Sequence, residues 1–315
     1  MHKETVVSQE AYTTAAGGSS VGTAVQVEKP PARRRSKELF AETLGRRLVR
    51  RVSAVPGARS LWRAFPAGPL ALRVEYGISA RPHYLYGLYN AASLAKQLGL
   101  PAISAIEFGV AGGRGLLAME AIAGEVSRNL GVQIKIYGFD GGTGMPPPVD
   151  YRDVAHVWDQ GFYKMDQEAL KARLQNASLV IGEVHKTVPG FLANSDAPPI
   201  GFVAFDLDYY SSTRAALQVL EGPAGSHLPR TYCYFDDLLW PEIACHNEYI
   251  GELAAIRDFN LEHEALKVCP INMFSYMHNY RAPWHEQMYV FHDFHHPLYC
   301  VNITPKTSYH TDLPL

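Results

Sequence analysis

The 315-residue sequence predicts an α/β fold, a doubly wound and mostly parallel sheet with helices on both faces. After residue 100, short apolar runs alternate with segments of helical periodicity. The runs are almost continuously apolar, which is typical of parallel strands that are buried on both faces. Hydrophobic residues make up 47% of the chain and charged residues 19%, so a large core can form and a wholly disordered chain is excluded.

The expected elements follow one another along the chain. Apolar and aromatic residues recur at helical spacing over 81–98, and Gly99 then favours the end of that helix. The apolar runs predict strands at 102–108, 134–139, 178–181, 201–205 and 231–235. Helical patterns lie at 114–129, 166–175 and 212–221, with a longer one at 245–263. Two further strand-like runs lie near 267–274 and 286–292.

Composition divides the chain into three parts. Residues 1–38 carry few large apolar groups and an excess of Lys and Arg, which predicts a disordered basic tail. We interpret it as a solvated arm, and we expect its deletion to leave the fold and the cofactor affinity nearly unchanged. Residues 39–100 are expected to form a helical N-terminal region, and 101–315 the domain that holds the sheet.

Charge and hydropathy exclude several kinds of partner. The net charge of −2 lacks the basic excess of a dedicated nucleic-acid binder. No apolar run approaches the roughly 18 residues of a membrane span, and the first residues show no apolar signal-peptide core. We therefore expect a cytoplasmic protein without a nucleic-acid or membrane partner. A homo-oligomer is left open.

A glycine-rich loop follows the first expected strand and opens a helix. Glycines let backbone N–H groups approach a ligand closely, and a helix N-terminus favours anionic or polar groups. Gly113 to Ala118 match the GxGxxA pattern of dinucleotide-binding proteins, although that pattern normally comes directly after the strand. The alternative pattern starts at the strand end with Glu107, Gly109 and Gly113, and resembles the first motif of class I S-adenosylmethionine methyltransferases.

The end of the second expected strand adds a carboxylate to this region. Asp140 stands where an acidic side chain suits two ribose hydroxyls. A glycine loop alone is also compatible with a structural turn. The loop and Asp140 together favour a cofactor that contains a nucleoside.

Four further carboxylates follow the fourth and fifth expected strands: Asp206, Asp208, Asp236 and Asp237. Ligands of open parallel sheets bind beyond the carboxyl ends of the strands, so these groups are expected to meet at one rim. Clustered like charges are costly unless a cation or a proton neutralises them. Because the cluster holds oxygen ligands and no His or Cys, it favours Mg²⁺, Ca²⁺ or Mn²⁺ over zinc. The alternative is that these acids cap the helices that follow them.

The residues around the cluster make the resemblance specific. The segment Asp206-Leu-Asp208-x-Tyr-x-Ser-Thr, followed by Asp236-Asp237, resembles the macrocin O-methyltransferase family. That family consists of metal-dependent, Rossmann-like class I methyltransferases that act on sugar hydroxyls of natural products. Glu107-Phe-Gly109-Val, the run Tyr-Gly-Phe-Asp140, and Gly182 with the Thr-Val-Pro that follows support the resemblance, which covers roughly residues 80–293.

The resemblance implies a role for each matching residue. Asp206, Asp236 and Asp237 correspond to magnesium ligands, and Asp208 to the general base. Because Asp208 lies two residues after Asp206, an extended strand end would place both side chains on the same side. The cofactor-binding residues would be Glu107, Gly109, Gly113, Asp140 and Gly182.

Some residues depart from the family's pattern. Gly141-Gly142-Thr143 and the triple proline 146–148 are unusual for it, and they leave the substrate less certain than the chemistry. His185 and His246 are candidates for contact with the substrate.

The sequence therefore predicts an O-methyltransferase that uses S-adenosylmethionine and Mg²⁺ and acts on a hydroxyl of a small molecule, with a sugar of a glycosylated natural product as the favoured acceptor. Two other functions stay open. The GxGxxA match is compatible with an NAD-type oxidoreductase, which would not need the carboxylate cluster. A noncatalytic protein that binds a nucleoside cofactor would use the same fold, because fold does not fix function.

Overall fold

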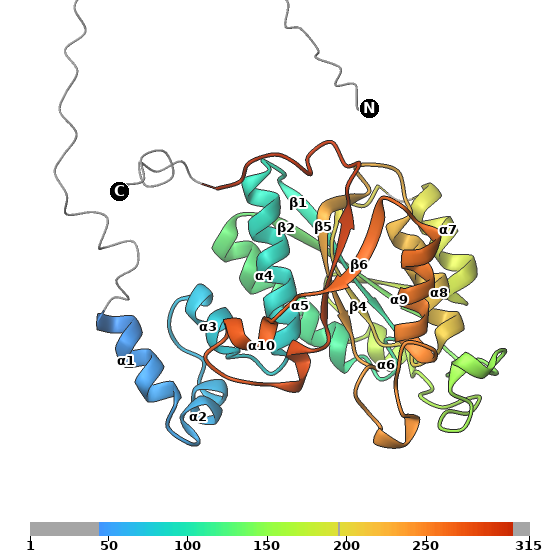
Figure 1. Ribbon diagram of the computed structural model, residues 1–315, viewed down its shortest axis with the longest axis horizontal. Helices are drawn as coiled ribbons and strands as arrows, with labels where there is room; N and C mark the ends of the chain where they lie inside the picture. The colour runs from blue at the N-terminus through green and yellow to red at the C-terminus, as the bar shows by residue number, and fades with distance from the viewer. Residues whose placement is uncertain (1–43, 195, 305–315) are drawn as a thin grey trace, which may run out of the picture. The chain divides into compact units, whose positions relative to one another are not determined.

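The computed structural model describes residues 44–194 and 196–304, and the predicted tail lies outside them. Seven strands form one sheet in the order β3-β2-β1-β4-β5-β7-β6 (Figure 1). Strands β1 to β5 pair in parallel, and β7 runs antiparallel to both β5 and β6. The strands are β1 Ala102–Phe108, β2 Gln133–Asp140, β3 Ala177–Ile181, β4 Ile200–Phe205, β5 His227–Phe235, β6 Leu266–Pro270 and β7 Met288–Asp293. The predicted doubly wound, mostly parallel sheet is confirmed.

Helices cover both faces of this sheet (Figure 1). Helices α4 and α5 pack on one face, and α7, α8 and α9 form the layer on the other. The helices are α1 Leu44–Ser53, α2 Ala58–Ala64, α3 Leu70–Tyr76, α4 Pro82–Gln97, α5 Arg114–Leu130, α6 Gln167–Lys171, α7 Val184–Asn194, α8 Tyr210–Leu217, α9 Gly251–Glu262 and α10 Phe274–Met277. Short 3-10 turns lie at η1 Tyr151–Asp153, η2 Gln218–Leu220, η3 Glu242–Ala244 and η4 Pro283–His285.

The central strands β1 and β4 are buried from both sides, as their apolar sequences predict, whereas the edge strands β3 and β6 are partly exposed. In β1, Ile103 and Ala105 join the core beneath α4 and α5, whereas Ile106 and Phe108 join the core beneath α7 to α9. Glu107 is buried near the end of the same strand, at the edge where the site lies.

Several segments differ from the sequence prediction. Strand β5 begins before the predicted residue 231, and α6 ends before the predicted residue 175. Helix α7 was not expected, and it contains Pro189. Helix α9 begins at Gly251, later than the helical pattern suggests, because Asn247 holds a turn by accepting from the N–H groups of Tyr249 and Ile250. The run near 267–274 is divided, since β6 ends at Pro270 and α10 begins at Phe274. Within the described part of the chain, no helix combines the length and the apolar character that a membrane crossing needs.

Candidate functional site

A pocket of about 1470 Å³ lies beyond the carboxyl ends of the parallel strands. Ligand pockets usually measure roughly 300–1,000 Å³, so this one has room for a cofactor and a second molecule. All but one of the residues predicted for the site line it: Glu107, Gly109, Asp140, Gly182, Asp206, Asp208, Asp236 and Asp237. Gly113 is the exception. It precedes α5 in a left-handed conformation, and a Cβ added there would meet the Leu170 side chain at 2.2 Å.

The turn after β1 requires Gly109 for a backbone reason. Its φ of +83° is a conformation that residues with a Cβ rarely adopt. A Cβ at this position would also lie 1.7 Å from the backbone carbonyl oxygen of Asp206. Gly109 therefore lets the loop after β1 pass close to the end of β4. Two of the predicted site residues, Asp206 and Asp208, follow that strand.

We expect Gly109→Ala to destabilise the protein by about 2–5 kcal/mol, the sum of a left-handed backbone penalty and a steric clash. Gly112→Ala is the matched control, because a Cβ at Gly112 meets nothing within 4 Å. The control should change stability by no more than about 0.5 kcal/mol. Urea unfolding of both variants measures this difference, and equal stabilities would contradict the steric account.

The dinucleotide pattern does not form a loop here. Helix α5 begins at Arg114, so Gly115 and the residues after it already belong to the helix. A Cβ on Gly115 would lie 1.8 Å from Glu107 Oε1. Gly115 thus makes room for a carboxylate of the protein, and the pattern loses the placement that a dinucleotide-binding loop needs.

Glu107 is a buried carboxylate with one oxygen unused. The Tyr84 hydroxyl donates to Oε1 at 2.6 Å, and Oε2 has no hydrogen-bond partner among the described residues. Burial raises the pKa of Glu107 to about 7, against the opposing effects of the Tyr84 hydrogen bond and of Arg81. An unused, buried acceptor that faces a pocket suits a cationic ligand group.

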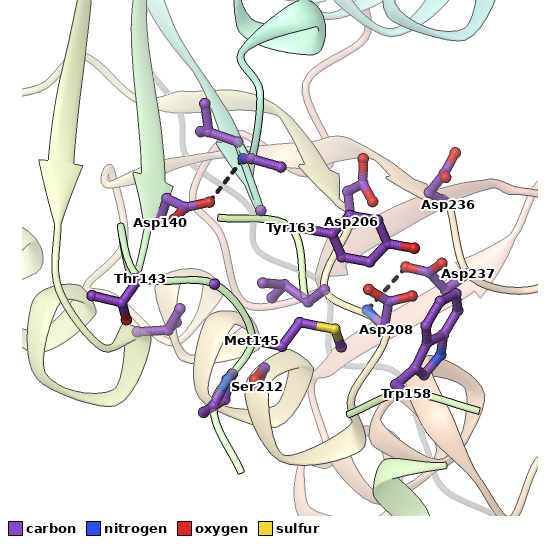
Figure 2. A pocket seen from close by; sticks show the side chains of 18 of the residues that line it. Asp140, Thr143, Met145, Trp158, Tyr163, Asp206, Asp208, Ser212, Asp236 and Asp237 are labelled. Atoms are coloured by element: carbon purple, nitrogen blue, oxygen red, sulfur yellow. Dashed lines mark hydrogen bonds between the residues drawn. The ribbon is translucent and has the colours of Figure 1, made fainter. Parts of the chain in front are cut away.

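Asp140 joins two loops of the site. Its carboxylate accepts a hydrogen bond from the backbone N–H of Ala111 at 2.8 Å, the dashed line at Asp140 in Figure 2, and another from the N–H of Gly142 at 2.6 Å. Each carboxylate oxygen can accept more than one hydrogen bond, so both keep capacity for ribose hydroxyls. Asp140 therefore holds the glycine loop in place and still faces the pocket.

Three carboxylates gather in the same pocket (Figure 2). One oxygen each of Asp206, Asp236 and Asp237 lies within 4.8 Å of the others. Asp206 follows β4, and Asp236 and Asp237 follow β5, so the parallel pairing of these strands brings them together. Tyr234 donates a hydrogen bond to Asp236, and the Gln287 side chain donates to the Asp236 carbonyl at 2.6 Å.

At Asp206, burial and the neighbouring carboxylates outweigh the positive charge of Arg81. Burial and the neighbouring carboxylates raise the pKa values of Asp206 and Asp237 well above their usual range. Carboxylates whose like charges repel one another are stabilised by a divalent cation that prefers oxygen ligands. The donor set of three carboxylates within 4.8 Å fits Mg²⁺ or Mn²⁺.

Asp208 lies beside the cluster because of a backbone conformation that strand alternation does not predict. Its φ is +57°, so the backbone is left-handed at this residue and the extended strand end expected from the sequence is absent. The Asp208 N–H donates to Asp237 Oδ2 at 2.9 Å, which fixes the turn against the carboxylate cluster (Figure 2). Asp208 is buried, and burial raises its pKa to about 7. A positive φ at a residue with a side chain is typical of functional sites.

Another carboxylate, which was not predicted from the sequence, lies behind the cluster. Glu252, at the start of α9, is fully buried and accepts a hydrogen bond from the Asp237 N–H at 3.1 Å. Its other oxygen, Oε1, has no partner in the described part of the chain. Burial and the nearby Asp237 raise the pKa of Glu252 well above its usual range. One Glu in the first turn of a helix gives no sequence signal for this contact.

The loop between β2 and α6 forms the outer wall of the pocket. Met145 and residues 161–162 exchange backbone hydrogen bonds of 2.8 and 2.9 Å, which close the loop on itself. Buried Asp153 then ties the loop to α8, because its carboxylate accepts from the N–H and hydroxyl of Ser211. Met145, Trp158 and Tyr163 line the pocket from this loop (Figure 2). The Trp158 indole N–H is buried without a partner among the described residues.

The unusual loop residues and the two histidines have different positions. Thr143, Pro146 and Pro147 line the pocket, as expected for residues at the substrate mouth. His185 also lines it, with Nε2 3.4 Å from a Glu183 carboxylate oxygen. His246 is not among the lining residues, and its Nε2 lies 3.1 Å from the Trp240 carbonyl oxygen.

No family model matches the chain, and no curated protein matches it. The solved structures that resemble it include CalS11, a calicheamicin methyltransferase, with 22% identity over 85% of this chain and 100% of that chain, at a TM-score of 0.44. The O-methyltransferase NovP has 15% identity over 68% of this chain and 96% of its own, at a TM-score of 0.43.

A third similar structure is TomG from Streptomyces achromogenes, an O-methyltransferase involved in tomaymycin synthesis. It shows 12% identity over 65% of this chain and 87% of its own, at a TM-score of 0.35. At such low identities and scores, these likenesses say nothing about what this chain binds. The order of the seven strands, with β7 antiparallel, confirms the predicted doubly wound, Rossmann-like sheet.

Proposed function

We propose that this protein is an S-adenosylmethionine- and Mg²⁺-dependent O-methyltransferase. Its acceptor would be a hydroxyl of a small molecule, and the resemblance to macrocin O-methyltransferases favours a sugar of a glycosylated natural product. One observation carries the proposal. A single pocket holds a glycine loop, the half-used carboxylate of Glu107, and three carboxylates that lie within 4.8 Å of one another.

The pocket has residues for both ligands. Asp206, Asp236 and Asp237 would hold Mg²⁺, which when bound polarises an acceptor hydroxyl and lowers its pKa. Glu107, Asp140, Gly182 and the loop at Gly109 would hold S-adenosylmethionine, whose sulfonium supplies the methyl group. The pocket is large enough to place the acceptor beside both ligands.

The chain's own residues supply the rest of the chemistry. Asp208 lies beside the carboxylate cluster and would accept the proton of the acceptor hydroxyl. The closed loop that carries Trp158 and Tyr163 would cover the acceptor and limit access of water. The indole N–H of Trp158, which lacks a partner, would donate to an acceptor oxygen.

Incubation with methyl-labelled S-adenosylmethionine, Mg²⁺ and a panel of sugars and glycosylated natural products tests this function. We expect label in a product that forms only when protein, metal and acceptor are all present. Calorimetric titration with S-adenosylhomocysteine and NAD separates the alternatives. Binding of NAD alone would favour an oxidoreductase, whereas cofactor binding without transfer to any acceptor would favour a noncatalytic protein.

Cofactor affinity is expected to depend on the ionisation of Glu107. The pKa of Glu107 is raised to about 7, so the carboxylate takes up a proton as the pH falls through that value. The protonated acid loses its attraction for the cofactor's ammonium, which stays charged below its own pKa of about 7.7–8.0. Calorimetry should show S-adenosylhomocysteine binding about tenfold more weakly at pH 5.5 than at pH 7, as a single group titrates.

Glu107→Gln is the control for this pH dependence. The variant should bind more weakly at pH 7, and its affinity should hardly change down to pH 5.5. A wild-type affinity that is flat over this range would contradict the role of Glu107.

A further inference from the structure

Arg81 brings a positive charge into the acidic pocket. It precedes α4, where Pro82 occupies the first turn, and its side chain lines the pocket together with Glu107 and Asp206. Its charge lowers the pKa values of both carboxylates, against the larger effect of their burial. The guanidinium is therefore close enough to influence the carboxylates at the C-terminal ends of β1 and β4.

The guanidinium has donors to spare. In residues 44–194 and 196–304, its only ring contact is with Tyr84, whose ring centroid lies 5.1 Å from Cζ, and the guanidinium makes no hydrogen bond or ion pair there. Two other pocket-lining cations, Arg114 and Lys164, are exposed, whereas Arg81 is half-buried. A partly desolvated guanidinium without a partner favours an anionic ligand.

Glu107 and Arg81 thus offer opposite charges at the same end of the pocket. Among the residues that the structure describes, Oε2 of Glu107 lacks a donor, and the guanidinium of Arg81 lacks an acceptor. This pair is complementary to a zwitterion, a group with one ammonium and one carboxylate. The amino-acid part of the proposed cofactor has both.

We propose that Arg81 binds the α-carboxylate of S-adenosylmethionine while Glu107 takes its ammonium. This assignment rests on the proposed function. Seven carboxylates line the pocket, so a ligand carboxylate that entered without a cation would be repelled: Glu107, Asp140, Glu183, Asp206, Asp208, Asp236 and Asp237. The planar fork of an arginine matches a carboxylate with two parallel hydrogen bonds.

Two ligands that differ in one group test the assignment. S-adenosylmethionine and decarboxylated S-adenosylmethionine are titrated calorimetrically into the wild type and Arg81→Gln, without acceptor. In the wild type, loss of the carboxylate should weaken binding by about 10–100-fold, the range for charge-assisted hydrogen bonds. Arg81→Gln should weaken S-adenosylmethionine by a similar factor and leave the decarboxylated ligand within about threefold, because the two losses remove one interaction.

Three further measurements make the result decisive. Arg81→Lys should fall between the wild type and Arg81→Gln, since it keeps the charge and loses the fork. Arg114→Gln, a pocket-lining arginine on an exposed position, should stay within about threefold of the wild type for both ligands. Circular dichroism confirms that each variant is folded.

Several outcomes would overturn the assignment. Equal losses for both ligands in Arg81→Gln would make Arg81 a counter-charge for the protein's own carboxylates. Equal losses in Arg81→Gln and Arg114→Gln would point to the general field of the pocket. If the wild type binds S-adenosylmethionine and Arg81→Gln binds it equally well, only this inference fails. If the wild type binds neither ligand, the proposed function fails.

Discussion

Replacing Asp208 by Asn is expected to lower the rate constant of methyl transfer by about 10²–10⁴-fold, the range for a positioned acid–base group. The substitution keeps the shape of the side chain and removes its basicity. The backbone N–H that donates to Asp237 is still present in the variant, so the turn should survive. Affinities for the metal and for S-adenosylhomocysteine should change little.

The measurement is the single-turnover rate at saturating cofactor, with Mg²⁺ raised until the rate no longer changes. If excess Mg²⁺ restores the rate of Asp208→Asn, the residue orients the metal site and is not the base. Glu183→Gln is the control, because Glu183 is an exposed carboxylate that also lines the pocket and pairs with Lys186. It should stay within about threefold of the wild type.

The sheet could be predicted because its signals are local. The runs at β1 to β4 are short and continuously apolar, and each is found within one residue of its predicted bounds. Helix α7 escaped because Pro189 interrupts a pattern of only eleven residues. The pairing of β7 between β5 and β6 is a contact between distant segments, and periodicity along the chain carries no information on it.

The site divides in the same way. The aspartates that end β4 and β5 could be placed at one edge, because parallel strands bring their carboxyl ends together. The side of the strand on which Asp208 lies could not be predicted, because the backbone at Asp208 is left-handed and does not follow the alternation of a strand. Arg81 and Glu252 come from distant helices, so only the fold shows that they adjoin the carboxylates.

The carboxylate cluster leads to the second large effect, the loss of activity on removal of the metal. We expect a chelator to lower the transfer rate by about 10³-fold, because a bound cation contributes several kcal/mol of stabilisation to a developing charge. Asp236→Asn should weaken Mn²⁺ binding in a metal titration and leave the affinity for S-adenosylhomocysteine nearly unchanged. Full turnover after verified removal of the metal would contradict the role of this cluster.

Stability without metal gives an independent view of the same site. Where folding raises the pKa of a carboxyl group, the folded protein loses stability as the pH rises above the pKa that the group has in the unfolded chain. Asp206 and Asp237 are such groups. In chelator at pH 7.5, Asp206→Asn should therefore melt at a higher temperature than the wild type, because one of the repelling charges is gone. Added Mg²⁺ should raise the melting temperature of the wild type far more than that of the variant. Thermal unfolding with and without Mg²⁺ measures both effects, and a variant that gains as much from the ion as the wild type would show that Asp206 does not hold it.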